Sequence, residues 1–157
     1  MSPDPNDPEH RRHAGRLASS YRYWTGQPLL PDRGETRAPL SHRLYHAPFA
    51  VLSHGGGADP IFDYANRQAQ LCFEMGWAEL TRLPSRLSAE PDRREERERL
   101  LAAVREHGFV TDYGGVRIAR SGRRFHIRGA VVWTLVDDQA NAVGQAALFS
   151  DWQPLGS

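Results

Sequence analysis

Residues 59–90 read DPIFDYANRQAQLCFEMGWAELTRLPSRLSAE, and this stretch predicts a strand, a capped helix and a second helix in direct succession. Ile61, Phe62 and Tyr64 are typical of a short strand. The side-chain oxygen of Asn66 can cap the helix that follows. Gly76 stands where a left-handed residue would end that helix. Apolar side chains between these two residues recur at i, i+3 and i+4, so we expect a buried helix face formed by Ala69, Cys72 and Phe73.

The sequence predicts an antiparallel sheet, with three of its five strands in the last third of the chain. Five runs with strand character are separated by turn residues, at 49–54, 60–64, 116–120, 124–136 and 142–149. Strict alternation along residues 124–136 would place Phe125, Ile127, Gly129, Val131, Trp133 and Leu135 on one face. The opposite face would carry Arg124, His126, Arg128, Ala130, Val132, Thr134 and Val136. Because this second face becomes apolar halfway along, we expect another element to cover it.

An amphipathic helix predicted over residues 14–24 is the economical cover for that face. Its apolar stripe repeats at spacings of four and three residues. The stripe comes from the same chain or from a second copy, and the sequence favours a homodimer over a monomer. The expected interface is Leu17, Tyr21, Trp24, Val132 and Val136. A further helix is predicted over residues 91–107, starting at Pro91, with its arginines in solvent and a buried stripe of Leu100, Leu101 and Val104.

Two segments, the end of the opening stretch and a later one, narrow the identification of the family. Residues 83–90 (LPSRLSAE) and 108–138 (GFVTDYGGVRIARSGRRFHIRGAVVWTLVDD) resemble the MEKHLA family, and the resemblance extends over residues 21–152. Its most specific positions are Gly108, Phe109, Ser121 to Arg123, Ala130, Trp133, Phe149 and Trp152. That family is PAS-like, stands alone in bacteria and also forms the C-terminal end of plant class III homeodomain leucine-zipper regulators. The resemblance implies an α+β fold, a PAS-like antiparallel five-stranded sheet with helices on one face and an N-terminal helix.

A PAS-like fold implies a pocket between the first sheet face and the helices of residues 66–107. The expected lining is Phe49, Val51, Cys72, Met75, Trp77, Leu87, Ile127, Val131 and Trp133. Such a lining suits a small organic ligand or a filled core, and the sequence leaves both open. Neither flavin nor haem is supported by a motif. The neighbours of Cys72 differ from the Asn-Cys-Arg-Phe setting of the light-sensing PAS relatives, so we expect a buried, unreactive cysteine.

Composition predicts one domain over residues 14–152, with a flexible tail at 1–13 and a C-terminal tail at 153–157. The 157 residues are 39% hydrophobic, enough for a single core. The chain has no apolar run of membrane-spanning length and no signal-peptide pattern, so we expect a cytoplasmic protein that does not bind membranes.

All twenty basic residues are arginine, which excludes Schiff-base catalysis and a Walker-type phosphate loop because both require lysine. The net charge of +1 argues against a general nucleic-acid-binding protein. The single cysteine excludes an internal disulfide and a cysteine-rich zinc site. A basic group around one hairpin is interpreted as solubilising surface or as a contact for an acidic partner, and it comprises Arg117, Arg120, Arg123, Arg124 and Arg128.

The chemical motifs are sparse. His42 and His46 have a spacing that could bind a metal, but no second motif supports a metal or haem site. An enzyme that uses Asp59, Asp63, His54 or His126 for proton transfer is an alternative from another class. We therefore expect a non-catalytic sensory or regulatory domain that binds a ligand in an apolar pocket and signals through a protein partner. The other alternative is a ligand-free structural dimerisation or interaction module.

Overall fold

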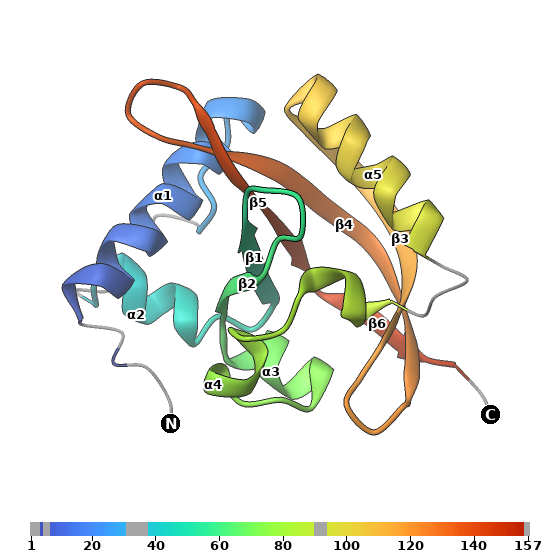
Figure 1. Ribbon diagram of the computed structural model, residues 1–157. Coiled ribbons are helices and arrows are strands. Elements are labelled where there is room, and N and C mark those ends of the chain that lie inside the picture. Colours follow the sequence, from blue (N-terminus) through green and yellow to red (C-terminus); the bar gives the residue numbers. More distant parts are fainter. Residues whose placement is uncertain (1–3, 5–6, 31–37, 90–93, 156–157) are drawn as a thin grey trace.

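The protein folds around a six-stranded antiparallel sheet, seen in a computed structural model that describes residues 4, 7–30, 38–89 and 94–155 (Figure 1). The strand order is β2-β1-β5-β4-β3, and β6 pairs with the free side of β4. The expected strand at 116–120 begins much earlier, and a short sixth strand follows the five predicted ones. The strands are β1 (Ala50–Gly55), β2 (Phe62–Ala65), β3 (Phe109–Ile118), β4 (Arg124–Val136), β5 (Ala142–Phe149) and β6 (Asp151–Pro154).

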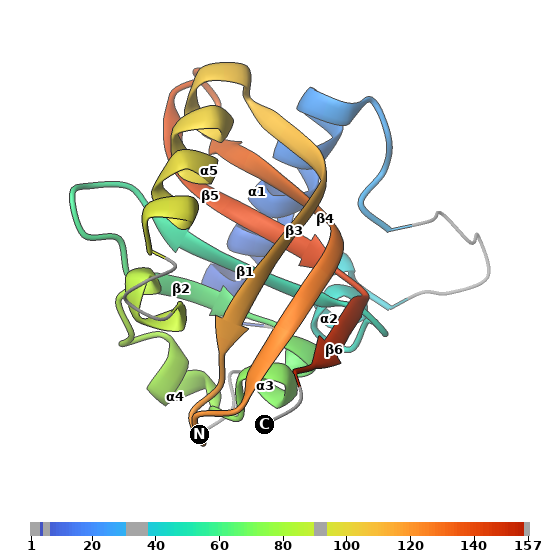
Figure 2. The same cartoon turned by 90° about the vertical axis from the view of Figure 1, so that its right-hand side faces the viewer.

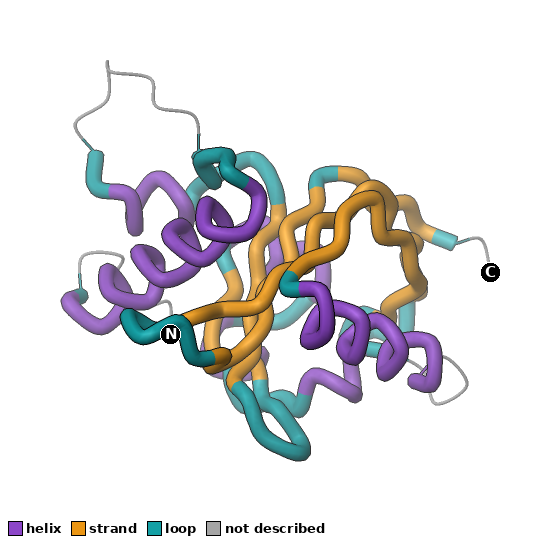
Figure 3. The backbone as a smooth tube through the Cα atoms, turned by 90° about the horizontal axis from the view of Figure 1, so that it is seen from above, coloured by secondary structure: helices purple, strands orange, loops and turns teal. Residues whose placement is uncertain are grey.

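Helices cover both faces of this sheet. In Figure 2, α1 lies behind the sheet and α5 in front of it, with α3 and α4 below, and Figure 3 shows helices on both sides of the strands. The helices are α1 (Pro8–Thr25), α2 (Leu40–Tyr45), α3 (Arg67–Phe73), α4 (Trp77–Leu80), the 3-10 helix η1 (Ser85–Ser88) and α5 (Arg94–His107). The expected start of α5 at Pro91 lies outside the described residues. The fold class predicted from the sequence, PAS-like α+β with an N-terminal helix, is confirmed.

Helix α3 begins as predicted and ends differently. Asn66 is its N-cap, with the side-chain Oδ1 accepting the Ala69 N–H at 3.1 Å. The left-handed residue at its end is Glu74, with φ of 60°, and not Gly76, whose φ of −77° makes it the N-cap of α4. The Glu74 carboxylate accepts the Ser121 backbone N–H at 3.1 Å, so the residue that ends α3 contacts the β3–β4 hairpin.

A bulge in β4 exchanges the two faces of that strand. Gly129 has φ of +63° and lies between two pairings of β4: Arg128 pairs with Asp151 of β6, and Val131 pairs with Leu148 of β5. A left-handed glycine inserts an extra step into the alternation. Ile127 and Val132 therefore share one face, and the prediction of one continuous face from Phe125 to Leu135 was wrong.

Helix α1 covers the other face within its own chain. Leu17 and Trp133 are both completely buried in one apolar cluster, and the Tyr21 ring meets Trp133 edge-on with centroids 5.0 Å apart. The Trp24 indole N–H donates to the Thr134 carbonyl at 2.8 Å. Three of the five expected interface residues are thus engaged inside the molecule. Of the other two, Val132 faces α5, and Val136 is half-buried as the last residue of β4.

Helix and strand structure extends beyond the expected domain limits at both ends. Helix α1 starts at Pro8, capped by the Asp7 side chain, so residues 8–13 are helical and do not belong to a tail. Strand β6 includes residues 153 and 154, which the sequence placed in the C-terminal tail. Residues 1–3, 5–6 and 156–157 of those tails lie outside the described residues. In the part of the chain that the structure describes, no helix combines the length and apolar character needed to cross a membrane.

Candidate functional site

A cavity lies between the sheet and the helices η1 and α5. Its volume is about 80 Å³. Strands β1, β4 and β5 form its floor, and α5 and the half-exposed β3 residues form its roof and side. Its lining is mainly apolar and includes Leu52, Phe62, Phe73, Leu101, Ile127, Val132 and Phe149. The lining also contains polar side chains, and the charged and buried ones among them decide what the cavity can hold.

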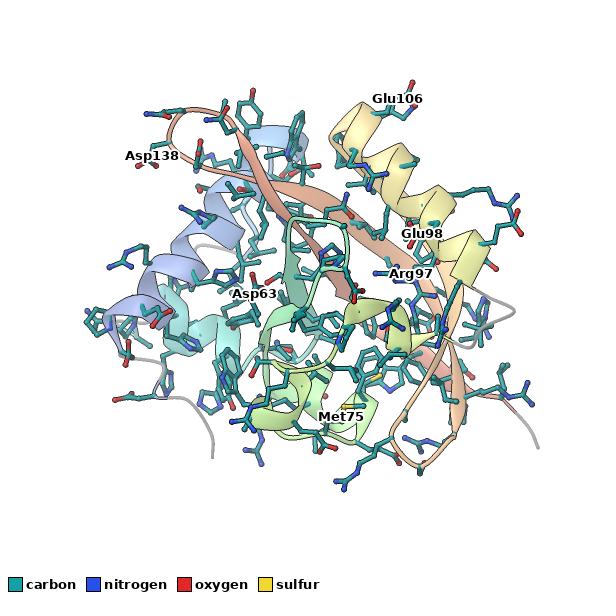
Figure 4. All side chains as sticks on the ribbon, in the orientation of Figure 1. Asp63, Met75, Arg97, Glu98, Glu106 and Asp138 are labelled. Carbon is teal, nitrogen blue, oxygen red and sulfur yellow. The ribbon has the colours of Figure 1, made fainter. Side chains whose placement is uncertain are left out.

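Arg97 is the most unusual of these groups, because only 4% of its side chain is exposed. It extends from the first turn of α5 toward the centre of the molecule (Figure 4). Its guanidinium donates to the Ser85 hydroxyl of η1 and, at 2.9 Å, to the carboxylate of Glu98, which is itself 63% exposed. Burial lowers the pKa of Arg97, against the opposing effect of Glu98. A buried arginine requires anionic or hydrogen-bonding partners, so this position is a candidate ligand contact.

The sequence contains a signal for the burial of Arg97. Arg97, Leu101 and Val104 are the buried residues of α5 and follow the spacing i, i+4 and i+7. An arginine in register with the apolar stripe of a helix is an exception to the usual pattern of a solvated polar face. The prediction that the arginines of this helix face water was wrong at Arg97.

Two further polar groups of the cavity come from the sheet. Arg117 of β3 donates to the Tyr113 hydroxyl at 3.1 Å and lies over its ring, 5.7 Å from the centroid. Gln145 of β5 donates through Nε2 to the Leu101 carbonyl at 3.1 Å. Its Oε1 is buried and accepts no hydrogen bond from the described residues. An orphaned buried acceptor is costly, which points to a partner supplied by a ligand or a bound water.

His54 of β1 is another polar group of the lining, beside the hydroxyl-bearing Ser53, Ser85 and Ser88. Its Nδ1 lies 2.8 Å from the Gly55 carbonyl oxygen. Burial lowers the pKa of His54 below its ordinary value near 6.5, opposed by that hydrogen bond and assisted by the charge of Arg97. The imidazole is therefore held neutral at physiological pH, as an uncharged element of a site that already contains two guanidinium groups.

This histidine predicts a loss of stability in mild acid. Its folded-state pKa is depressed, so below about pH 6.5 the unfolded chain binds a proton that the native chain does not, and unfolding becomes easier as the pH falls. Urea midpoints at pH 7.5 and 5.5 should differ less for His54→Gln than for the wild type. His107→Gln, at an exposed site on α5, should keep the wild-type difference. Equal pH dependence in wild type and His54→Gln would contradict this account.

The structure separates the residues that the sequence assigned to the pocket. Of the nine, Ile127 lines the cavity. Cys72 is buried in the neighbouring core beside α3, with Met75 packed against that core. The exposed Leu87 lies on η1, 38% accessible. The remaining five belong to the cluster beneath α1, and they are Phe49, Val51, Trp77, Val131 and Trp133. Alternation along β1 places Val51 there, and the bulge in β4 places Val131 and Trp133 there.

The residues proposed for proton transfer are also apart. Asp63 lies on the α1 side (Figure 4), where its carboxylate accepts the Ser53 hydroxyl and lies 3.5 Å from His13 Nε2. His54 points into the cavity on the opposite face of the sheet. Asp59 pairs with Arg86 at 3.0 Å on the surface, and His126 is half-buried on β4. The four residues therefore form no common acid–base site.

The other candidate groups have structural surroundings. Burial raises the pKa of the Cys72 thiol to about 12, as suits an unreactive core side chain. His42 and His46 lie 4.6 Å apart by ring centroids and are exposed. Within the described ranges, no three His, Cys, Asp or Glu side chains converge as a metal site would need. Two arginines of the basic hairpin pair with glutamates near α3 and α4: Arg120 with Glu79 at 3.2 Å and Arg123 with Glu74 at 3.6 Å.

Comparison with known proteins identifies the family of this chain. The sequence profile of the MEKHLA domain matches residues 11–154. The homeobox-leucine zipper protein ATHB-15 of Arabidopsis thaliana is 23% identical over 145 residues, which are 92% of this chain and 17% of that protein. The chain thus spans about a sixth of the length of this curated relative.

Solved PAS domains share the fold. A PAS domain from Colwellia psychrerythraea superposes with a TM-score of 0.61 at 12% identity, covering 73% of this chain and 92% of that one. The PAS domain of a LuxR-family transcriptional regulator from Burkholderia thailandensis, solved in complex with ethanol, gives 0.53 at 17% identity, covering 73% and 95%. At these identities the likeness is one of fold, and ligand and output must be argued from this chain's own residues.

Proposed function

Since the chain belongs to the MEKHLA domain family, we propose that it acts as a cytoplasmic sensory domain that binds a small ligand in the cavity beneath α5. Occupancy of the cavity changes the association of the domain with another protein. The observation that carries the proposal is the presence of a buried arginine and an orphaned amide oxygen in an otherwise apolar cavity. A core that serves packing alone does not need a buried charge, and it is destabilised by one.

The size of the cavity limits the ligand. Ordinary small-molecule sites measure about 300–1,000 Å³, against about 80 Å³ here. A water molecule requires about 10–15 Å³, so there is room for about five to eight water-sized groups. That is far less than a flavin or haem needs. The Burkholderia PAS domain solved with ethanol supports the idea that a domain of this fold can hold a molecule of few atoms.

Association with a partner is the output that we propose. A second copy of the chain is one such partner, and a separate regulatory protein is the other. Because the stripe of Leu17, Tyr21 and Trp24 packs on its own sheet, a homodimer would contact a different surface while α1 stays docked. A ligand that shifts the packing of α5 against the sheet would alter such a surface through its differential affinity for two conformations.

The small volume also favours a second candidate, a ligand-free interaction module. Native mass spectrometry of the purified protein, before and after mild denaturation, separates the two. For the sensory domain we expect a mass excess, smaller than that of a flavin, that disappears on unfolding. A bare sequence mass under both conditions would favour the module instead. The same spectra report whether the protein is a monomer or a dimer.

A further inference from the structure

We propose, resting on the function proposed above, that the ligand is a short-chain carboxylic acid bound as its anion. The carboxylate contacts the Arg97 guanidinium, and a short apolar body lies against the cavity wall formed by Leu101, Ile127, Val132 and Phe149. Four features of the site support this chemical class: the free donors of Arg97, the excess of positive charge, the apolar wall and the size of the space.

The first feature is the hydrogen-bonding capacity that Arg97 retains. A guanidinium carries five N–H donors, and among the described residues two of them have acceptors, Ser85 and Glu98. The remaining three belong to a side chain that is almost fully buried and lines the cavity. A carboxylate matches the planar fork of a guanidinium with two parallel hydrogen bonds, which is the strongest way to use such donors.

The second feature is charge. Two guanidinium groups, those of Arg97 and Arg117, line the cavity. No aspartate or glutamate lines it among the residues that the structure describes, and the Glu98 partner of Arg97 is largely in solvent. His54 adds no positive charge, because its burial disfavours protonation. An incoming anion would therefore meet an excess of positive charge in a region of low dielectric, where the attraction is strong.

The apolar wall and the volume separate a carboxylic acid from an inorganic anion. Phosphate or sulfate presents polar oxygens on all sides and would leave most of them against aliphatic and aromatic side chains, which is unfavourable. A short-chain acid joins one charged group to an apolar body, which suits a lining that combines two guanidinium groups with apolar side chains. Room for about five to eight water-sized groups accommodates acids such as propionate and butyrate. The orphaned Gln145 Oε1 can accept a hydrogen bond from a water molecule enclosed with the ligand.

The test is a titration followed by amide chemical shifts in a chloride-free buffer at pH 7.5. The probes are butyrate, its neutral analogue butyramide, and inorganic phosphate. We expect butyrate to shift the amides of β4 and β5 around the cavity saturably, and to bind at least 10-fold more tightly than butyramide or phosphate. Arg97→Met should weaken butyrate about 10- to 100-fold, the loss expected for hydrogen bonds to a charged group. Arg105→Met, at an exposed site on the same helix, should bind as the wild type does.

Each contrary outcome is informative. Equal binding of butyrate and butyramide would overturn acid recognition while leaving a ligand-binding cavity in place. Phosphate as tight as butyrate would make this an inorganic-anion site and overturn the carboxylic-acid class. Absence of any shift near the cavity would overturn the proposed ligand, and native mass spectrometry would then decide separately on the sensory function. If Arg97→Met fails to fold, the butyrate-to-butyramide ratio in the wild type decides the question.

Discussion

Asn66→Ala should destabilise the domain by about 3–5 kcal/mol, because one buried amide joins three elements. The side chain is fully buried. Its Oδ1 accepts the backbone N–H groups of Val51 at 3.0 Å and Ala69 at 3.1 Å, and its Nδ2 donates to the carbonyls of Phe49 at 2.8 Å and Leu44 at 3.1 Å. All four hydrogen-bonding positions of an asparagine side chain are thus occupied. Its removal would take this hydrogen bond from the buried N–H groups of Val51 and Ala69 and from the Phe49 carbonyl, while the Leu44 carbonyl would keep its bond from the Ala47 N–H.

Urea unfolding followed by circular dichroism measures this effect, and a second helix cap gives the matched control. Asp7 caps α1 at an exposed site with a single hydrogen bond to the Glu9 N–H, so Asp7→Ala should cost about 0.5–1 kcal/mol. Asn66→Asp should also be strongly destabilised, since a carboxylate cannot donate to the two carbonyls. A loss at Asn66→Ala no larger than at Asp7→Ala would mean that the bridge between α2, β1 and α3 is not important for stability.

Much of the fold could be predicted because local chemistry determines it. Asn66 is a capping residue followed by an apolar helical pattern, and both the cap and the buried face of α3 are found in the structure. The stripe of Leu17, Tyr21 and Trp24 indicated a helix in need of an apolar partner, and α1 packs on the sheet. Such patterns depend on a few neighbouring residues and on the period of one element, so a single sequence contains them.

The candidate site was predicted poorly because it depends on register between elements. The left-handed backbone at Gly129 moves Val131 and Trp133 from the expected pocket face to the α1 face. A glycine within a strand pattern is not sufficient to predict a bulge. Glu74, which ends α3, is held by the hairpin 47 residues further along the chain. Arg97 was assigned to solvent on composition although its spacing matched the buried stripe. A pattern along one helix or strand does not predict which side chains of different elements come into contact.

Trp133→Ala should lower the free energy of unfolding by about 3–5 kcal/mol, as large-to-small substitutions of buried aromatic residues do. Trp133 is completely buried and packs edge-on with Tyr21 of α1. Its Nε1 has no hydrogen-bond partner among the described residues, so its contribution comes from packing and buried apolar area. Trp133→Phe should therefore cost much less than Trp133→Ala. Tyr23→Ala, at a residue of α1 that is 60% exposed, should stay within about 0.5 kcal/mol of the wild type.

The location of the damage tests the exchange of faces in β4. If Trp133 faces α1, the alanine variant weakens the packing of that helix on the sheet. Amide hydrogen exchange should then increase more in α1 than in α5. The cavity beneath α5 should then keep its affinity for butyrate in the folded variant, because Trp133 does not line it. A larger increase in α5, or weakened butyrate binding with α1 protection intact, would return Trp133 to the pocket face that strict alternation predicts. An unchanged urea midpoint would contradict its burial altogether.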